Sequence, residues 1–205
     1  MLTILIPTLN RSHILKQRVE NALANSPAGT TVLLIIDDEE SHKVCMENNF
    51  DFHLYAAPYP AKINEGYRYV ETPYFFIGAD DLNFHPNWFE EALKMEKPVV
   101  GINDLVGTGP ASTHFLVYTK YIQEKSGVLD MPNTVMYPYL HNFCDAELWK
   151  TTTYRGDYTY AKDSIVEHMH PSVGKALEDD INRKNQSTFA LDEATFNERK
   201  HLWEK

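Results

Sequence analysis

Two adjacent carboxylates, Asp80 and Asp81, are the residues whose type and position point most directly to chemistry. They follow the apolar run 74–77 in the stretch YFFIGADDLNFHPNWF. An apolar run that ends in small and acidic residues is typical of a buried strand leading into a loop. Neighbouring carboxylates repel each other unless a positive group lies beside them. The pair therefore either holds a divalent cation such as Mg²⁺ or Mn²⁺, or has a structural role as a helix cap or an Asx turn.

Two histidines, His168 and His170, form a second candidate cluster in the stretch IVEHMHP. The segment 158–168 has an extended pattern, and residues two apart in a strand project from the same face. Two imidazoles on one face could supply a metal ligand and a phosphate contact. The alternative is a pair of surface histidines before Pro171.

A third acid, Asp145, begins an expected short helix over 145–150 in the stretch HNFCDAELWK. A carboxylate in that place is either the N-cap of the helix or a general base presented to a cleft. On local grounds the cap is the stronger interpretation. Glu147 is a second acidic candidate, but a helix would direct it to another face.

Polar residues after the second apolar run and at the start of a later helix would suit a nucleotide. Asp37 and Asp38 could accept hydrogen bonds from a nucleobase or a ribose, or could be solvated loop acids. Lys62, Asn64 and Gly66 lie in AKINEGY, where a helix N-terminus and a lysine would attract phosphate. Lys62 could equally be a surface charge.

The elements that must position these residues alternate along the first half of the chain. Continuous apolar runs predict strands over 2–6, 32–36, 52–55, 74–77 and 98–102, and helical spacing predicts helices over 11–24, 41–48, 61–70 and 86–95. Strands that are apolar throughout favour a parallel sheet covered on both faces. Ligands bind beyond the carboxyl ends of such strands. Thr8, Asn10 and Arg11 follow the first strand, and the two acid pairs follow later strands, so all three clusters are expected at one edge.

The second half of the chain is less regular. It has an alternating strand over 113–119, a Pro- and Tyr-rich loop over 133–139, the short helix over 145–150, the extended segment 158–168 and a final helix over 192–203. The sequence therefore predicts one α/β domain over 1–205, with a mostly parallel central sheet flanked by helices. A nucleotide-type half, 1–102, precedes a mixed half, 103–205.

The composition narrows the class of protein. The chain has 205 residues, a net charge of −10 and no block of lysines or arginines, which disfavours non-specific binding of nucleic acid. Two cysteines, Cys45 and Cys144, give neither a disulfide framework nor zinc spacing and favour a reducing compartment. Neither a signal peptide nor a membrane span is expected, so the predicted location is cytoplasmic. The absence of G-x-G-x-x-G and G-x-x-x-x-G-K-[ST] disfavours dinucleotide cofactors and the Walker mode of gripping triphosphates.

The order of these motifs resembles that of GT-A glycosyltransferases of family 2. The resemblance rests on PTLNR, the acid pair after the second strand, A-x-x-N-x-G, and an apolar strand leading into G-A-D-D-x-x-x-x-P. It spans roughly residues 2–170, where CDAEL and VEHMH resemble the base segment and the metal-ligand segment. The compact size also resembles that of small transferases encoded by bacteriophages.

The resemblance implies a role for each matching residue. The residues that would line the nucleotide pocket or lie against the nucleotide are Pro7, Thr8, Arg11, Asp37, Asp38, Lys62, Asn64 and Gly66. Asp80 would bind the metal ion, and His168 or His170 would complete its shell. Gly78 stands where the family carries the first acid of its Asp-x-Asp motif. Asp81 would compensate for that loss, or the nucleotide is held differently.

The resemblance also implies an activity. It is a metal-dependent transfer, with Mn²⁺ or Mg²⁺, of a sugar from a nucleotide-diphosphate sugar to an acceptor hydroxyl. A UDP-sugar is the favoured donor, the expected stereochemical outcome is inversion, and Asp145 would be the base. The acceptor would be a glycan, a small molecule or a protein.

Three alternatives stay open from the sequence. The acceptor could be a hydroxymethylated DNA base of a phage genome, although the negative net charge weighs against it. The chain could be a non-catalytic module that binds a nucleotide sugar or a glycan, in line with the missing first acid at Gly78. A nucleotidyltransferase shares the alternating sheet and the metal, but it normally has a Gly-rich loop after the first strand, which PTLNRS lacks.

Overall fold

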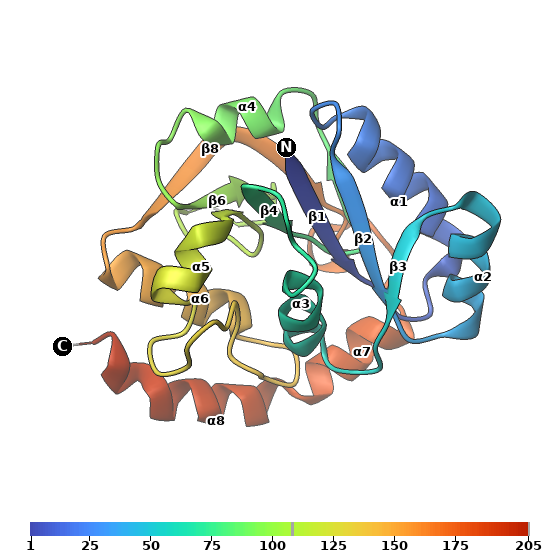
Figure 1. Ribbon diagram of the computed structural model, residues 1–205. Helices are drawn as coiled ribbons and strands as arrows, with labels where there is room; N and C mark the ends of the chain where they lie inside the picture. Colours follow the sequence, from blue (N-terminus) through green and yellow to red (C-terminus); the bar gives the residue numbers. More distant parts are fainter. Residues whose placement is uncertain (108, 205) are drawn as a thin grey trace.

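A computed structural model describes residues 1–107 and 109–204, and its centre is an eight-stranded sheet (Figure 1). The strands are β1 (Leu2–Pro7), β2 (Thr31–Ile36), β3 (Asp51–Leu54), β4 (Tyr74–Ile77), β5 (Leu82–Phe84), β6 (Val99–Asn103), β7 (Phe115–Tyr118) and β8 (Tyr158–His168). The α-helices are α1 (Ser12–Ala24), α2 (Glu39–Asn48), α3 (Tyr59–Tyr67), α4 (Trp88–Leu93), α5 (Thr119–Lys125), α6 (Cys144–Tyr154), α7 (Asp180–Ser187) and α8 (Phe189–Arg199). Two 3-10 turns, η1 (Pro171–Val173) and η2 (Lys200–Leu202), follow β8 and α8.

The sheet runs in the order β3-β2-β1-β4-β7-β6-β8-β5. β1 pairs in parallel with β2 and β4, and β2 pairs in parallel with β3, so the first half forms the expected parallel unit. Beyond β4 the sheet is mixed, because β7 is antiparallel to β4 and β6, and β5 is antiparallel to β8. The predicted fold class, an α/β sheet flanked by helices with a mixed second half, is confirmed.

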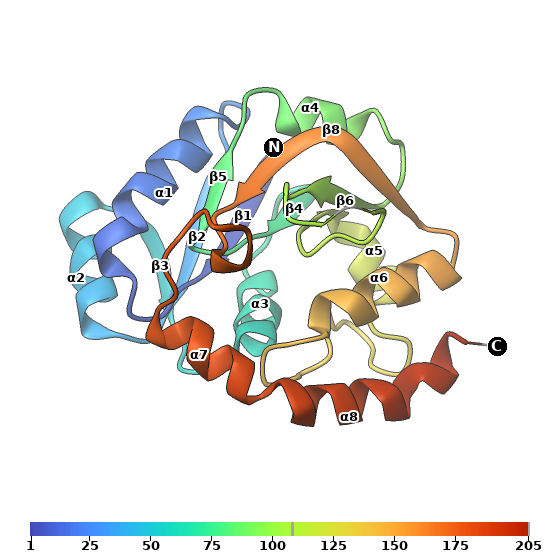
Figure 2. The same cartoon turned by 180° about the vertical axis from the view of Figure 1, so that it is seen from behind.

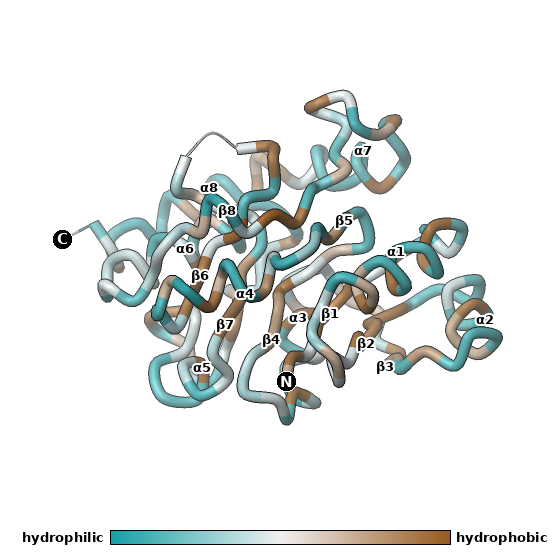
Figure 3. Tube along the Cα trace, turned by 90° about the horizontal axis from the view of Figure 1, so that it is seen from above, coloured by the Kyte–Doolittle hydropathy of each residue, from teal (hydrophilic) through white to brown (hydrophobic). Residues whose placement is uncertain are grey.

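Helices cover both faces of the sheet, and each face has its own apolar core. Ile4 and Ile6 of β1 belong to the core under α1, α2 and α4. Leu5 of the same strand belongs to the core under α3, α5 and α6. Successive strand residues point to opposite faces, so a strand buried on both sides must be apolar throughout. Figure 3 shows the hydrophobic stretches concentrated along the central strands.

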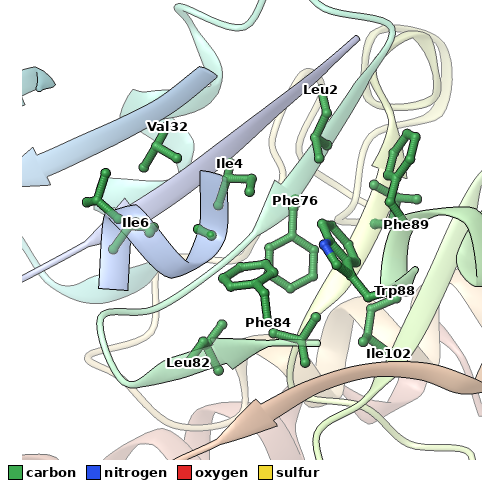
Figure 4. Packing of buried hydrophobic residues seen from close by; sticks show 14 of the residues in the cluster. Leu2, Ile4, Ile6, Val32, Phe76, Leu82, Phe84, Trp88, Phe89 and Ile102 are labelled. Carbon is green, nitrogen blue, oxygen red and sulfur yellow. The ribbon is translucent and has the colours of Figure 1, made fainter. Parts of the chain in front are cut away.

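An aromatic cluster supports the end of β4, next to the acid pair. Figure 4 shows Phe76 of β4 packed with Phe84 of β5 and Trp88 of α4. Their ring centroids lie 4.9 to 5.4 Å apart in tilted, edge-on arrangements. Aromatic side chains contribute large buried areas and defined contact geometries. The loop 78–81 between β4 and β5 is therefore anchored on both sides by packed strands.

Three elements, β5, α5 and α7, are not predicted by the sequence pattern. β5 has only three residues and forms by pairing with the distant β8. α7 has little apolar character, and its first turn is held by a capping box between Asp179 and Asn182. The predicted helix over 86–95 is shorter in the structure, because Asn87 has a φ of 64° directly before α4. Pro86 therefore precedes the helix and does not lie in its first turn.

The last helices lie along one edge of the molecule. Figures 1 and 2 both show α7 beyond the carboxyl ends of β1, β2 and β3, with α8 continuing along the same edge.

Among the helices that the structure describes, none combines the length and the apolar character needed to cross a membrane.

Candidate active site

A cavity of about 750 Å³ lies where β1, β2 and β4 end, between these strands and residues of α6 and α7. Ten of the thirteen predicted site residues line it: Pro7, Thr8, Arg11, Asp37, Lys62, Asp80, Asp81, Asp145, His168 and His170. The three that do not line it are Asp38, Asn64 and Gly66. Segments that are far apart in the sequence thus meet in one space at the edge where ligands bind in such sheets.

Arg11 is the centre of the charged wall of this cavity. It lies in the turn from β1 into α1, directly after Asn10, which has a φ of 54°. Its Nη1 donates to Asp80 Oδ1 at 2.6 Å and to Asp81 Oδ2 at 3.1 Å. Its Nε donates to Asp179 Oδ2 at 2.9 Å. One guanidinium therefore joins both acids after β4 to the residue that caps α7.

These charges fix one another's protonation. Burial alone would lower the pKa of Arg11, but its carboxylate partners raise it, so Arg11 stays charged. Burial raises the pKa of Asp80, an effect that Arg11 reduces and the charge of Asp81 reinforces. Burial would also raise the pKa of Asp81, but contact with His168 and the charge of Arg11 hold it well below its ordinary range. Asp81 is therefore the more acidic member of the pair.

The short strand β5 explains how His168 reaches the acid pair. β5 follows Asp81 directly and pairs antiparallel with the end of β8, so that Leu82 lies opposite His168. His168 Nε2 thereby comes within 3.3 Å of Asp81 Oδ1. Burial would lower the pKa of His168, but Asp81 raises it overall. The ring of His170 lies next to it, with 5.0 Å between the centroids.

A further histidine, His114, lines the cavity and was not singled out by the sequence pattern. Its ring centroid lies 5.2 Å from that of His168, and its Nδ1 lies 3.1 Å from the carbonyl oxygen of Ile77. A carbonyl oxygen only accepts, so Nδ1 carries the proton. Burial and the charge of His168 lower the pKa of His114 to about 4. No local pattern marks this residue, because its neighbours come from other strands.

Asp145 lines the cavity from the first turn of α6. The N-cap of α6 is Phe143, which has a φ of 66° and makes no side-chain cap hydrogen bond. Asp145 is therefore not the cap, and the alternative that it caps the helix is wrong. Burial raises the pKa of Asp145, and the backbone N–H groups at the start of the helix partly offset this rise. A raised pKa suits a carboxylate that must take up a proton.

The segment before Asp145 is held in place by α8. The carboxylate of Asp192, which is buried, accepts hydrogen bonds from the backbone N–H groups of Leu140, His141 and Asn142 at 2.8 to 2.9 Å. His141 also lines the cavity, and burial lowers its pKa to about 4. The final helix therefore positions the wall that carries Asp145.

Lys62 supports the cavity where β1 and β2 end. Its side chain is buried, and its Nζ donates to the carbonyl oxygen of Thr8 at 2.7 Å. The same Nζ lies 3.0 Å from Asp37 Oδ1. Burial lowers the pKa of Lys62, and Asp37 acts in the opposite direction. The alternative that Lys62 is a surface charge is wrong, because its ammonium group holds two strand ends together.

The three predicted residues outside the cavity make other contacts. Asp38 caps α2 by accepting from the backbone N–H of Ser41 at 2.8 Å, so it is not a solvated loop acid. Asn64 donates to the carbonyl oxygen of Met136 at 2.8 Å. A Cβ on Gly66 would lie 2.8 Å from a side chain of β2, which shows how closely α3 packs on that strand. The nucleotide contacts expected of these three residues stay predictions.

Gly78, where the resemblance expects an acid, leaves no room for one. Its N–H donates to the carbonyl oxygen of Leu5 at 2.9 Å, and a Cβ on Gly78 would lie 2.8 Å from that same oxygen. Its own carbonyl oxygen accepts from the hydroxyl of Tyr59 at 3.1 Å. The close approach of β4 to β1 at this point therefore requires glycine.

The donor types around the acid pair fit a hard divalent cation. Within residues 1–107 and 109–204, no three His, Cys, Asp or Glu side chains are grouped as a complete metal site. Cations that bind substrate phosphates commonly use only one or two protein carboxylates, and Asp80 and Asp81 are two such groups at the wall of a cavity. Mn²⁺ also accepts imidazole nitrogen as a ligand, and His168 offers one beside the pair. The pair therefore fits an ion that a diphosphate helps to hold.

Comparison with known proteins gives similarity in structure only. Neither a protein-family profile nor a curated protein matches the sequence. A mannosyltransferase from Pyrobaculum calidifontis, solved with GDP-Man and Mn²⁺, gives a TM-score of 0.60 at 13% identity, covering 85% of this chain and 58% of that one. Glucosyl-3-phosphoglycerate synthase from Mycobacterium tuberculosis, solved with Mn²⁺, UDP and glucosyl-3-phosphoglycerate, gives 0.61 at 8% identity, covering 94% and 79%. The catalytic domain of Drosophila beta1,4galactosyltransferase 7, solved with xylobiose, gives 0.53 at 14% identity, covering 82% and 70%.

These similarities define the fold. The chain has a GT-A-like fold, which it shares with glycosyltransferases that differ in the sugar they transfer. It spans less than two thirds of the mannosyltransferase, at 58% of its length. At identities of 8 to 14% the likeness concerns the arrangement of strands and helices, and the chemistry depends on this chain's own residues.

Proposed function

We propose that this chain is a glycosyltransferase that moves a sugar from a nucleotide-diphosphate sugar to an acceptor hydroxyl. The observation that carries the proposal is the cavity where β1, β2 and β4 end, because the acid pair, Arg11 and Asp145 all line it. It is supported by solved structures of the same fold that hold GDP-Man or UDP together with Mn²⁺.

The walls of the cavity suit the two substrates in different ways. Pro7, Thr8 and Asp37 lie where β1 and β2 end, and they contact the nucleotide of the donor, for which UDP is favoured. Arg11, which follows β1, and the acid pair, which follows β4, lie beside the diphosphate. The acceptor binds at the remaining wall, which is formed by residues 140–146 and carries Asp145.

Asp145 is the general base of the proposed reaction. It takes the proton of the acceptor hydroxyl while that oxygen forms a bond to the anomeric carbon. The bond from this carbon to the diphosphate oxygen breaks, and the nucleoside diphosphate leaves with the bonding electrons. Attack from the face opposite the diphosphate inverts the configuration. Holding both substrates in this geometry is a major source of rate.

A Mn²⁺ or Mg²⁺ ion is part of the proposal. Asp80 would be its ligand from the loop after β4, with Asp81 beside it, and His168 or His170 would be a further ligand. Bound there, the ion supplies positive charge that stabilises the departing diphosphate. The chain's own contribution is to place the two carboxylates on a loop anchored by β4 and β5.

The proposed acceptor is a hydroxyl of a glycan, a small molecule or a protein. A hydroxymethylated base of bacteriophage DNA ranks below these, because the chain carries a net charge of −10 and duplex binding draws on positive surface. A cytoplasmic location and a phage origin stay predictions from the sequence.

A panel of nucleotide sugars tests the proposal. Each sugar is added with Mn²⁺ or Mg²⁺, and both the thermal shift and the released nucleoside diphosphate are measured. We expect one nucleotide sugar to raise Tm and to release its diphosphate in the presence of a suitable acceptor. A panel in which no nucleotide sugar binds with either ion would contradict the proposal.

A non-catalytic binding module is the second candidate, and Gly78 favours it. The glycine removes the first acid of the expected metal motif and has no space for a replacement. Such a module would bind a nucleotide sugar in calorimetry and release no diphosphate with any acceptor. Diphosphate release that depends on Asp145 would exclude it.

A further inference from the structure

The positive side chain of Arg11 contacts both the acid pair and the start of α7. The Arg11 side chain is only 10% exposed, and its Nη1 lies 2.6 Å from Asp80 Oδ1 and 3.1 Å from Asp81 Oδ2. A divalent ion on the acid pair needs the same carboxylates. Two positive groups so close together repel each other strongly in a partly buried site.

We propose that Arg11 is an internal counter-ion that competes with the divalent cation for Asp80 and Asp81, and that its displacement frees α7. This inference rests on the proposed function only in assuming that the acid pair takes a cation. Two buried carboxylates without a positive partner would be strongly destabilised. Without the ion Arg11 offsets part of their negative charge, and with the ion its planar guanidinium is free to bind the phosphates of the donor.

α7 is coupled to this exchange through Asp179. The Arg11 Nε donates to Asp179 Oδ2 at 2.9 Å. Asp179 also caps α7, accepting from the Asn182 N–H at 2.8 Å, while the Asn182 side chain accepts from the Asp179 N–H at 3.0 Å. α7 contributes Ile181, Asn182, Lys184 and Asn185 to the lining of the cavity. When Arg11 leaves the acid pair, the charged contact that holds the start of α7 at the cavity is lost.

This coupling is reciprocal by linkage. A change that moves α7 away from the cavity removes one of the three carboxylate partners of Arg11, and so eases its replacement by the ion. The Asp179 side chain is 41% exposed, whereas those of Asp80 and Asp81 are 8% and 14% exposed. The contact of Arg11 with Asp179, the N-cap of α7, is therefore weaker than its contacts with the acid pair, and the acid pair sets the position of Arg11.

Binding of Mn²⁺ alone, without any nucleotide, is the primary test. Free Mn²⁺ is measured by electron paramagnetic resonance with wild type, Arg11→Gln and the control Arg68→Gln. Arg68 is exposed on the protein surface, where it pairs with Glu65. We expect Arg11→Gln to bind Mn²⁺ about ten- to a hundredfold more tightly than wild type, because a competitor with two charge-assisted hydrogen bonds is gone. Arg68→Gln should bind as wild type does, and equal affinity of Arg11→Gln and wild type would overturn the proposal.

A second variant covers the case in which Arg11→Gln does not fold. Arg11→Lys keeps a positive charge, but its compact ammonium lacks the fork that joins the carboxylates. It should fold, as judged by circular dichroism, and should bind Mn²⁺ more tightly than wild type by a smaller factor. A folded Arg11→Lys with wild-type Mn²⁺ affinity would also overturn the proposal.

Hydrogen exchange of the α7 amides tests the coupling. Saturating Mn²⁺ should speed exchange in α7 of wild type. Asp179→Asn keeps a good N-cap while it removes the charge that faces Arg11. In this variant α7 should exchange faster without Mn²⁺ and should respond little to it. Unchanged α7 exchange in wild type with bound Mn²⁺ would overturn the coupling.

Neither measurement uses a sugar donor. A failure of sugar transfer alone would therefore contradict the proposed function and leave the role of Arg11 standing. Conversely, transfer by wild type with no gain of Mn²⁺ affinity in the Arg11 variants would contradict the role of Arg11 alone.

Discussion

The two halves of the molecule hold their candidate site residues by different means. In the first half, Thr8, Asp37 and Asp80 follow the ends of parallel strands whose apolar runs are buried on both faces. In the second half, His141 and Asp145 lie on a segment that is held by Asp192 of α8. The first half thus builds the proposed donor wall, which is charged, on the sheet itself. The second half builds the proposed acceptor wall from contacts between distant segments.

The largest effect is expected from Asp80→Ala, in the first half. Removing the proposed ion ligand should abolish donor binding in Mn²⁺ and lower turnover by about a thousandfold or more. The control Asp51→Ala removes an exposed acid of β3 and should have little effect. Both are measured by calorimetry with the donor and by diphosphate release. Undiminished transfer by Asp80→Ala would contradict the metal role.

A smaller effect with a different signature is expected from Asp145→Asn, in the second half. The amide cannot take up the acceptor proton, so turnover should fall about a hundredfold or more while donor affinity is kept. Donor binding and turnover are measured separately. Loss of donor binding would show that Asp145 belongs to the donor wall, and the contrast between the halves would fail.

The sequence predicted the first half well because its signals are local. An apolar run followed by acids marks a buried strand end, and the parallel arrangement of β1, β2 and β4 brings those ends to one edge. Seven of the ten predicted residues that line the cavity come from this half.

The partners of those residues could not be predicted in the same way. Arg11 meets Asp80 across 69 positions and Asp179 across 168 positions of the chain. β5 depends on pairing with β8, and α7 on its cap, so neither carries an apolar pattern of its own. His114 reaches the cavity because β7, which follows it directly, pairs beside β4.

His114, in the second half, should make the stability of the folded chain depend on pH. The pKa of His114 is lowered from 6.5 to about 4 in the folded chain, so the unfolded chain binds its proton first as pH falls. The contribution of His114 to the free energy of unfolding is therefore complete above about pH 6.5 and is lost towards pH 4. In total it amounts to about 3 kcal/mol. Urea unfolding at several pH values measures it. His114→Gln should show a shallower loss below pH 6.5, and an unchanged slope would contradict the buried neutral imidazole.

The smallest effect concerns the rigidity of the strand ends. Gly78→Ala places a Cβ against the Leu5 carbonyl oxygen and should lower the free energy of unfolding by about 1 to 3 kcal/mol. Gly109→Ala is the matched control, because its added Cβ meets nothing within 4 Å. Thermal or urea unfolding compares the two. Equal stability of both variants would mean that the end of β4 is less constrained than the first half requires.

Product analysis tests the central claim most directly. The protein is incubated with Mn²⁺, the donor that binds best and a panel of acceptors, and both the nucleotide product and the anomeric configuration of the glycoside are determined by NMR. We expect a nucleoside diphosphate in equal amount to a glycoside of inverted configuration, with both lost in Asp145→Asn. Donor binding without any release of diphosphate, or pyrophosphate release from a nucleoside triphosphate, would contradict glycosyl transfer.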